Sequence, residues 1–140
     1  MYRRSHSSRL IVTVSIAAVL SLTSLGCQQG LDVAEVTGQV TMDGAPMQGV
    51  AVEFQPVKGS PSYGTTDDNG NYELLFKPGL QGALLGPHKV RITGGDVENE
   101  YGETVTVDVN IPKRYNKETT LEYTVVKGKN ESVDWELTSR

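Results

Sequence analysis

Cysteine and histidine are almost absent from this chain. Cys27 is the only cysteine in 140 residues, and the two histidines are His6 and His88. A single cysteine cannot form an intramolecular disulfide, and so few ligands cannot build a His-rich or Cys-rich zinc site. No serine lies in the sharp strand-to-helix turn that exposes a catalytic serine. We therefore predict that the chain is not an enzyme and holds no cofactor or metal.

Basic charge is also scarce. The chain has 13 basic and 17 acidic residues, and Arg3, Arg4 and Arg9 are the only charged side chains before Asp32. Without those three arginines the count is 13 − 3 = 10 basic against 17 acidic, a net charge of 10 − 17 = −7. Nucleic acid requires a basic face, so we expect no nucleic-acid partner. A polybasic contact with anionic lipid is disfavoured for the same reason.

Long hydrophobic runs are limited to one, at the N-terminus. It extends from Leu10 to Leu25 with only serine and threonine between the apolar residues, and arginines precede it. A membrane-spanning helix needs about 20 apolar residues, and this run is shorter. The layout is typical of a secretory signal peptide, which we assign to residues 1–26.

The end of this leader carries a more specific signal. Its sequence Thr23-Ser24-Leu25-Gly26-Cys27 resembles the lipobox of bacterial lipoproteins, although Ser24 stands where that motif usually has leucine. The resemblance implies cleavage before Cys27 and lipid attachment to it, with residues 27–32 as a lipidated tether. Two or three acyl chains would give stable membrane anchoring. Gln28 in the next position implies sorting to the outer membrane of the bacterial cell envelope, and the alternative is an ordinary signal peptide.

Sustained helical periodicity is missing from residues 33–140, and alternation of apolar and polar residues takes its place. The predicted strands cover residues 35–42, 50–55, 62–66, 72–76, 88–93, 105–111, 121–125 and 133–137. Asn69-Gly70 predicts the turn of a β-hairpin between residues 65 and 74. About seven strands at this spacing predict one all-β domain, an Ig-like or prealbumin-like β-sandwich.

Several of these segments together resemble a known domain. They are residues 36–44, residues 46–54 and the turn Thr66-Asp67-Asp68-Asn69-Gly70-Asn71-Tyr72. These segments look like the carboxypeptidase regulatory-like domain, a transthyretin-like β-sandwich, and residues 111–128 are similar to small bacterial lipoproteins that carry it. The enzymes closest to this fold, the hydroxyisourate hydrolases, end in Tyr-Arg-Gly-Ser. This chain ends Glu136-Leu137-Thr138-Ser139-Arg140, so that activity is not implied.

Two acidic segments are candidate cation sites. Asp67 to Asn71 gathers oxygen ligands of the kind that Ca²⁺ prefers, but it lacks the EF-hand spacing. We interpret it as a turn in which aspartate and asparagine bond to the backbone. Asp96 to Glu103 is predicted to be a solvated loop that faces a partner.

The remaining candidates are aromatic or basic. Tyr63 and Tyr101 are predicted in loops, where their rings could contact a glycan or a partner. His88 and Trp135 lie on the same face of their predicted strands as the neighbouring apolar residues, so both are predicted to lie in the core. Lys113 and Arg114 form a small basic corner.

Our leading hypothesis is a non-catalytic protein-interaction or structural module of the cell envelope, with an unidentified envelope protein as partner. The alternative is a carbohydrate or cell-wall binding module.

Overall fold

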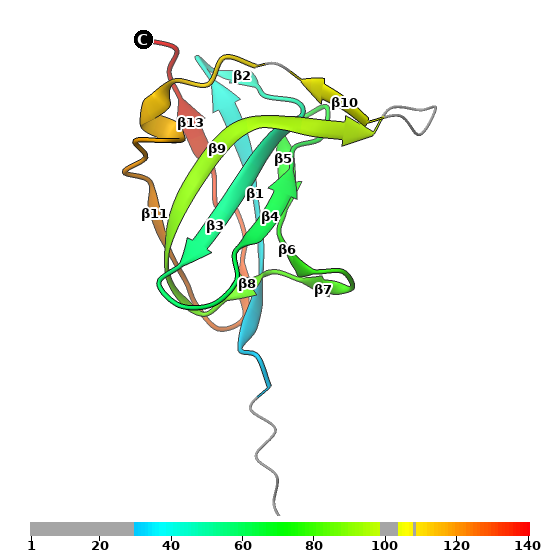
Figure 1. Ribbon diagram of the computed structural model, residues 1–140, viewed down its shortest axis with the longest axis vertical. Helices are drawn as coiled ribbons and strands as arrows, with labels where there is room; N and C mark the ends of the chain where they lie inside the picture. The colour runs from blue at the N-terminus through cyan, green and yellow to red at the C-terminus, as the bar shows by residue number, and fades with distance from the viewer. Residues whose placement is uncertain (1–29, 99–103, 108) are drawn as a thin grey trace, which may run out of the picture.

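The computed structural model describes residues 30–98, 104–107 and 109–140, which form an all-β sandwich of two sheets (Figure 1). The predicted fold class is therefore confirmed. Residues 1–29, which include the predicted signal peptide and Cys27, lie outside the described part, as do residues 99–103 with Tyr101.

The first sheet is organised around one long strand, β1 (Val33–Met42). Three short strands pair with it in antiparallel fashion: β2 (Ala45–Pro46), β5 (Asn71–Glu73) and β8 (Ala83–Leu84). Two more, β12 (Lys129–Asn130) and β13 (Trp135–Leu137), pair with it in parallel. One continuous strand thus holds together segments that lie far apart in the sequence.

The second sheet is entirely antiparallel and has the order β10-β9-β3-β4-β6-β7, with β11 also paired to β9. Its strands are β3 (Val50–Pro56), β4 (Ser62–Thr65), β6 (Leu75–Lys77), β7 (Leu80–Gln81), β9 (Gly86–Glu98), β10 (Thr104–Val107) and β11 (Glu122–Val125). The helical content of the described residues is one 3₁₀ turn at Lys113–Tyr115, which contains the predicted basic corner of Lys113 and Arg114.

The core lies between the sheets and follows the predicted alternation. Fully buried side chains come from alternate positions of β1, β3 and β9, namely Val36, Val40, Val50, Val52, Phe54, Val90 and Ile92. Each large apolar side chain that is removed from water in this way stabilises the fold by about 1.5–3 kcal/mol. Met42, Tyr123 and Trp135 pack against this cluster while remaining partly exposed.

The predicted hairpin at Asn69-Gly70 is wrong in its strand pairing. β4 pairs with β3 and β6, whereas β5 pairs with β1. The turn therefore carries the chain from one sheet to the other. Gly70 has a φ of 75°, and its carbonyl accepts a hydrogen bond of 2.8 Å from the N–H of Val40. This docking on β1 overrides the local preference for a two-stranded ribbon.

The strand predicted over residues 88–93 is longer in the structure, because β9 continues through Gly94-Gly95 to Glu98. A Cβ atom on Gly95 would lie 2.4 Å from the carbonyl oxygen of Gly49, so glycine here permits two backbones to approach closely. Beyond this point β10 replaces β3 as the partner of β9. The first part of the predicted loop Asp96 to Glu103 is consequently strand, and the rest lies outside the described residues.

Short strands also form where connections were predicted. β7 and β8 lie within residues 77–87, and β12 lies in the turn after Lys127. Asn130 explains the second case, because its side-chain amide donates hydrogen bonds to the carbonyls of Glu35 (3.1 Å) and Val126 (3.0 Å). Asn130 is buried, so these bonds fix the turn against the start of β1.

Candidate functional site

The candidate site is a shallow apolar groove of about 720 Å³ on the outer face of β4 and β6. Tyr63 and Leu75 are directly opposite each other on these two strands, and 52% and 47% of their surfaces are exposed. The other residues that line the groove are Gly64, Thr65, Glu73, Phe76, Lys77 and Pro78. We call this set the β4–β6 groove.

Alternation along β4 explains why Tyr63 faces outward. Ser62 and Gly64 are buried, and Tyr63 and Thr65 are exposed. A Cβ atom on Gly64 would lie 2.5 Å from the carbonyl oxygen of Glu73, so only glycine lets the chain pass this close behind the groove. Tyr63 was predicted to be an exposed contact residue in a loop; it is exposed, but it lies in a strand.

Leu75 is the residue of this site that the sequence analysis missed. Alternation continues from β5 into β6, so Tyr72 and Leu74 are buried and Leu75 is exposed. Two consecutive leucines break the period of two that a half-buried strand shows. That break was the available signal in the sequence.

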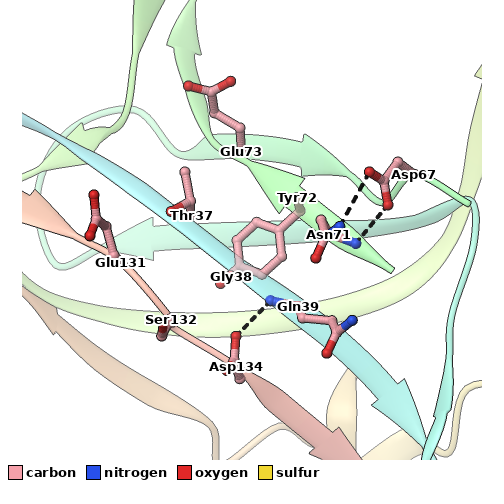
Figure 2. Close-up of a pocket in the computed structure, with 10 residues that line it drawn as sticks. All are labelled: Thr37, Gly38, Gln39, Asp67, Asn71, Tyr72, Glu73, Glu131, Ser132 and Asp134. Atoms are coloured by element: carbon pink, nitrogen blue, oxygen red, sulfur yellow. Dashed lines mark hydrogen bonds between the residues drawn. The ribbon is translucent and has the colours of Figure 1, made fainter. Parts of the chain in front are cut away.

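A second hollow, of about 620 Å³, lies beside β1 and is polar. Its lining is Thr37, Gly38, Gln39, Asp67, Asn71, Tyr72, Glu73, Glu131, Ser132 and Asp134 (Figure 2). The four carboxylates lie on different sides of the hollow and do not point to a common centre. Within the described residues, no three histidine, cysteine, aspartate or glutamate side chains form a group that could hold a metal ion.

The carboxylates Asp67 and Asp134 of this polar hollow bond to the backbone. Asp134 accepts a hydrogen bond of 2.8 Å from the N–H of Gln39. Asp67 accepts hydrogen bonds from the backbone N–H groups of Asn71 (2.8 Å) and Asn69 (2.9 Å). These bonds, that of Asn71 first, hold the pKa of Asp67 below its usual value. The geometry of the Asp67–Asn71 turn thus matches the interpretation as a backbone-bonding turn.

Tyr72 lies at the base of the polar hollow and connects it to the core. Its hydroxyl donates a hydrogen bond of 2.7 Å to the carbonyl of Val133 and accepts one of 3.0 Å from the indole N–H of Trp135. Burial raises the pKa of Tyr72, so this phenol stays protonated. The Trp135 ring lies edge-on to Phe54, with 6.3 Å between ring centroids. Trp135 therefore packs against the core, as predicted, but it is only half-buried.

His88 is buried in the core as the alternation predicted, with 3% of its surface exposed. Its Nδ1 lies 2.9 Å from the carbonyl oxygen of Gly86, which can only accept, so Nδ1 is the donor. Nε2 is buried and has no hydrogen-bond partner within the described residues. Burial lowers the pKa of His88, and the ring is neutral near pH 7.

The basic corner closes the fold. The Arg114 guanidinium donates hydrogen bonds to Oγ1 of Thr138 (2.9 Å) and to the carbonyls of Thr138 and Arg140. It also stacks over the ring of Tyr115 at 4.7 Å. These contacts hold the C-terminal segment in place, which gives the corner a structural role.

The chain was compared with models of protein families, with curated proteins and with solved structures, and none of the three comparisons finds a match. The resemblance to the carboxypeptidase regulatory-like domain therefore stays a prediction. No helix among the described residues is long and apolar enough to cross a membrane. The described residues define a small all-β sandwich that carries the polar hollow beside β1 and the apolar β4–β6 groove.

Proposed function

We propose that this chain is an exported bacterial lipoprotein, anchored through a lipid on Cys27, whose transthyretin-like sandwich serves as a non-catalytic interaction module of the cell envelope. The observation that carries the second half of the proposal is the β4–β6 groove. Tyr63 and Leu75 expose about half of their surfaces side by side on neighbouring strands. Side chains of this size gain most from burial when a partner covers them.

The composition of the groove supports a protein as the partner. An aromatic and an aliphatic side chain occupy the middle, and Glu73 and Lys77 flank Leu75 along the chain. Protein interfaces share this arrangement of an apolar centre with a polar rim, and tyrosine is enriched at their centres. The processed chain is acidic, so a partner with a basic or neutral surface is favoured.

One observation supports the alternative, a carbohydrate or cell-wall binding module. The Tyr63 ring is half-exposed beside the polar side chains of Thr65, Glu73 and Lys77. An aromatic face next to hydrogen-bonding groups can stack on a sugar ring while the polar groups bind its hydroxyls.

The anchor is tested by Cys27→Ser in the full-length chain. We expect the wild-type protein to sediment with membranes and the variant to be released in soluble form, because the thiol that carries the lipid is missing. Fractionation followed by immunoblotting measures this. Retention of the variant in the membrane fraction would contradict the lipoprotein assignment.

The groove is tested by in-cell crosslinking of the membrane-anchored protein. A photoreactive phenylalanine analogue at position 63 preserves an aromatic ring in the groove, and the same analogue at exposed Thr124 on β11 is the matched control. We expect one protein adduct from position 63, absent from position 124, that disappears when Leu75→Asp is added. Adducts with cell-wall fragments alone would favour the carbohydrate alternative, and identical products from both positions would contradict a site at the groove.

A further inference from the structure

One end of the sandwich exposes apolar side chains on three separate segments. Leu31 precedes β1, Val57 follows β3 and Val126 follows β11, and their exposed fractions are 55%, 79% and 55%. Isolated exposed apolar residues are common on protein surfaces, whereas several at one location indicate an interaction site. We call the end that carries these three residues the basal end.

The strand register places all three segments at the same end. Pro56 is paired with His88, and Val125 is paired with Gly86. The chain therefore leaves the sheet at Val57 and at Val126, in both cases near the start of β9. The carbonyl of Asp32, next to Leu31, accepts a hydrogen bond of 2.9 Å from the N–H of Leu85, which directly precedes that start. Figure 1 shows β3 pointing toward the end of the sandwich at which β1 begins, with the C-terminus at the opposite end.

The basal end is also where the N-terminal chain enters the fold. Five residues lie between Cys27 and Val33, the first residue of β1. A chain of this length reaches at most about 20 Å even when it is fully extended. A lipid on Cys27 would therefore hold the basal end at the membrane surface. The opposite end, where Ala45 pairs with Met42, is about 30 Å farther away along the length of β1.

The charges at the basal end suit a lipid surface. Lys58, Lys127 and Lys129 are exposed there, and so are Asp32, Glu35 and Glu131. Lys129 lies 3.5 Å from Glu35 and 4.0 Å from Glu131. The basal end is therefore close to neutral although the processed chain has a net charge of 10 − 17 = −7. Its charge neither attracts it strongly to lipid phosphate groups nor repels it from them. Contact between its apolar side chains and the lipid is therefore the main interaction.

We propose that the basal end docks on the phospholipid surface, with Val57 and Val126 inserted at the boundary between headgroups and acyl chains. The lysine stems extend toward the phosphates beside them, in the manner known as snorkelling. This inference depends on lipid attachment at Cys27, as proposed above. It fixes the orientation of the domain: β2 and the C-terminus point away from the bilayer.

The test uses the full-length lipidated protein, reconstituted into phosphatidylcholine vesicles. Because the Cys27 thiol is acylated, a cysteine introduced elsewhere is the only one that reacts with a fluorescent label. Labels are placed at Val57→Cys and Val126→Cys, with Ala45→Cys, exposed at the opposite end, as the matched control. All three positions are exposed, and Trp135 fluorescence verifies that each labelled protein is folded.

We expect lipids with a nitroxide on the acyl chain to quench the labels at positions 57 and 126 several-fold more than the label at position 45. Aqueous iodide should give the reverse order. Equal quenching at all three positions would overturn the docking. So would protection from iodide at 57 and 126 without quenching by nitroxide lipid, because a protein would then cover the basal end. If mass spectrometry finds no acyl group on Cys27, both this inference and the proposed lipoprotein function fail.

Discussion

The polar hollow beside β1 and the β4–β6 groove share Glu73 as a lining residue but differ in how their side chains are used. In the hollow, Asp134 and Asp67 accept hydrogen bonds from the backbone, and Tyr72 connects Val133 to Trp135. In the groove, Tyr63 and Leu75 contribute exposed surface that nothing within the described residues covers. A depression whose side chains bond to the fold serves stability, whereas one whose side chains are uncovered is available to a partner.

The largest effect should come from Gly38→Ala, in the polar hollow. The added Cβ would lie 1.9 Å from the carbonyl oxygen of Val133, which is backbone and cannot turn away. We expect the free energy of unfolding to fall by about 3 kcal/mol or more, or the protein to fail to fold. Urea denaturation measures this. Gly30→Ala is the control, because nothing lies within 4 Å of a Cβ at Gly30. Similar stabilities for the two variants would contradict the tight packing of β1 against Val133.

The next largest effect is expected for Trp135→Ala. This change removes a ring that packs on Phe54 and the hydrogen bond to the Tyr72 hydroxyl. Large-to-small changes at fully buried aromatic residues cost about 3–5 kcal/mol. Because Trp135 is only half-buried, we expect a value near the lower end, measured by chemical denaturation. A loss below about 1 kcal/mol would mean that the ring contributes little to the core.

A smaller effect, which depends on pH, is expected from His88. Burial lowers its pKa in the folded state, so below the ordinary value of about 6.5 the unfolded chain binds a proton that the folded protein resists. Stability should be constant above that pH and should decrease as the pH falls from about 7 to 5. His88→Phe, which keeps a ring beside Phe54, should flatten this dependence. An unchanged slope in the variant would assign the pH dependence to other groups.

The smallest effect on stability is expected in the groove. Leu75→Asp and Tyr63→Ala should each change the free energy of unfolding by within about 0.5 kcal/mol, because both side chains are half-exposed. Leu75→Asp should in addition abolish capture of the partner by the photoreactive residue at position 63. A loss of several kcal/mol would show that the groove belongs to the core, and the contrast with the polar hollow would disappear.

Much of the fold could be predicted because alternation is a local property of the sequence. Val36 and Val40, or Val52 and Phe54, are two residues or a multiple of two apart, and the burial of one face follows directly. His88 could be assigned to the core by the same parity. In these cases the residue type and its neighbours contain the required information.

The candidate site could be predicted only in part. Tyr63 stood out as an aromatic contact residue, although it was predicted in a loop and lies in β4. Leu75 did not, because its position opposite Tyr63 depends on β6 pairing with β4, directly after the pairing of β5 with β1. The pairing joins Gly38 to Tyr72, 34 positions away in the sequence. No local pattern contains a contact of this kind.

The sequence by itself determined the class of structure, the scarcity of cysteine and histidine and the acidic charge, and it contains the motif from which the lipid anchor is predicted. These follow from composition, period and short motifs. Only the tertiary structure decided which strands are neighbours, that Asn69-Gly70 joins two sheets, and that Tyr63 lies opposite Leu75. The same holds for the location of Leu31, Val57 and Val126 at one end. The physical reason is that these juxtapositions are set by backbone pairing and close glycine contacts between distant segments, which minimise the free energy of the whole chain rather than that of any one segment.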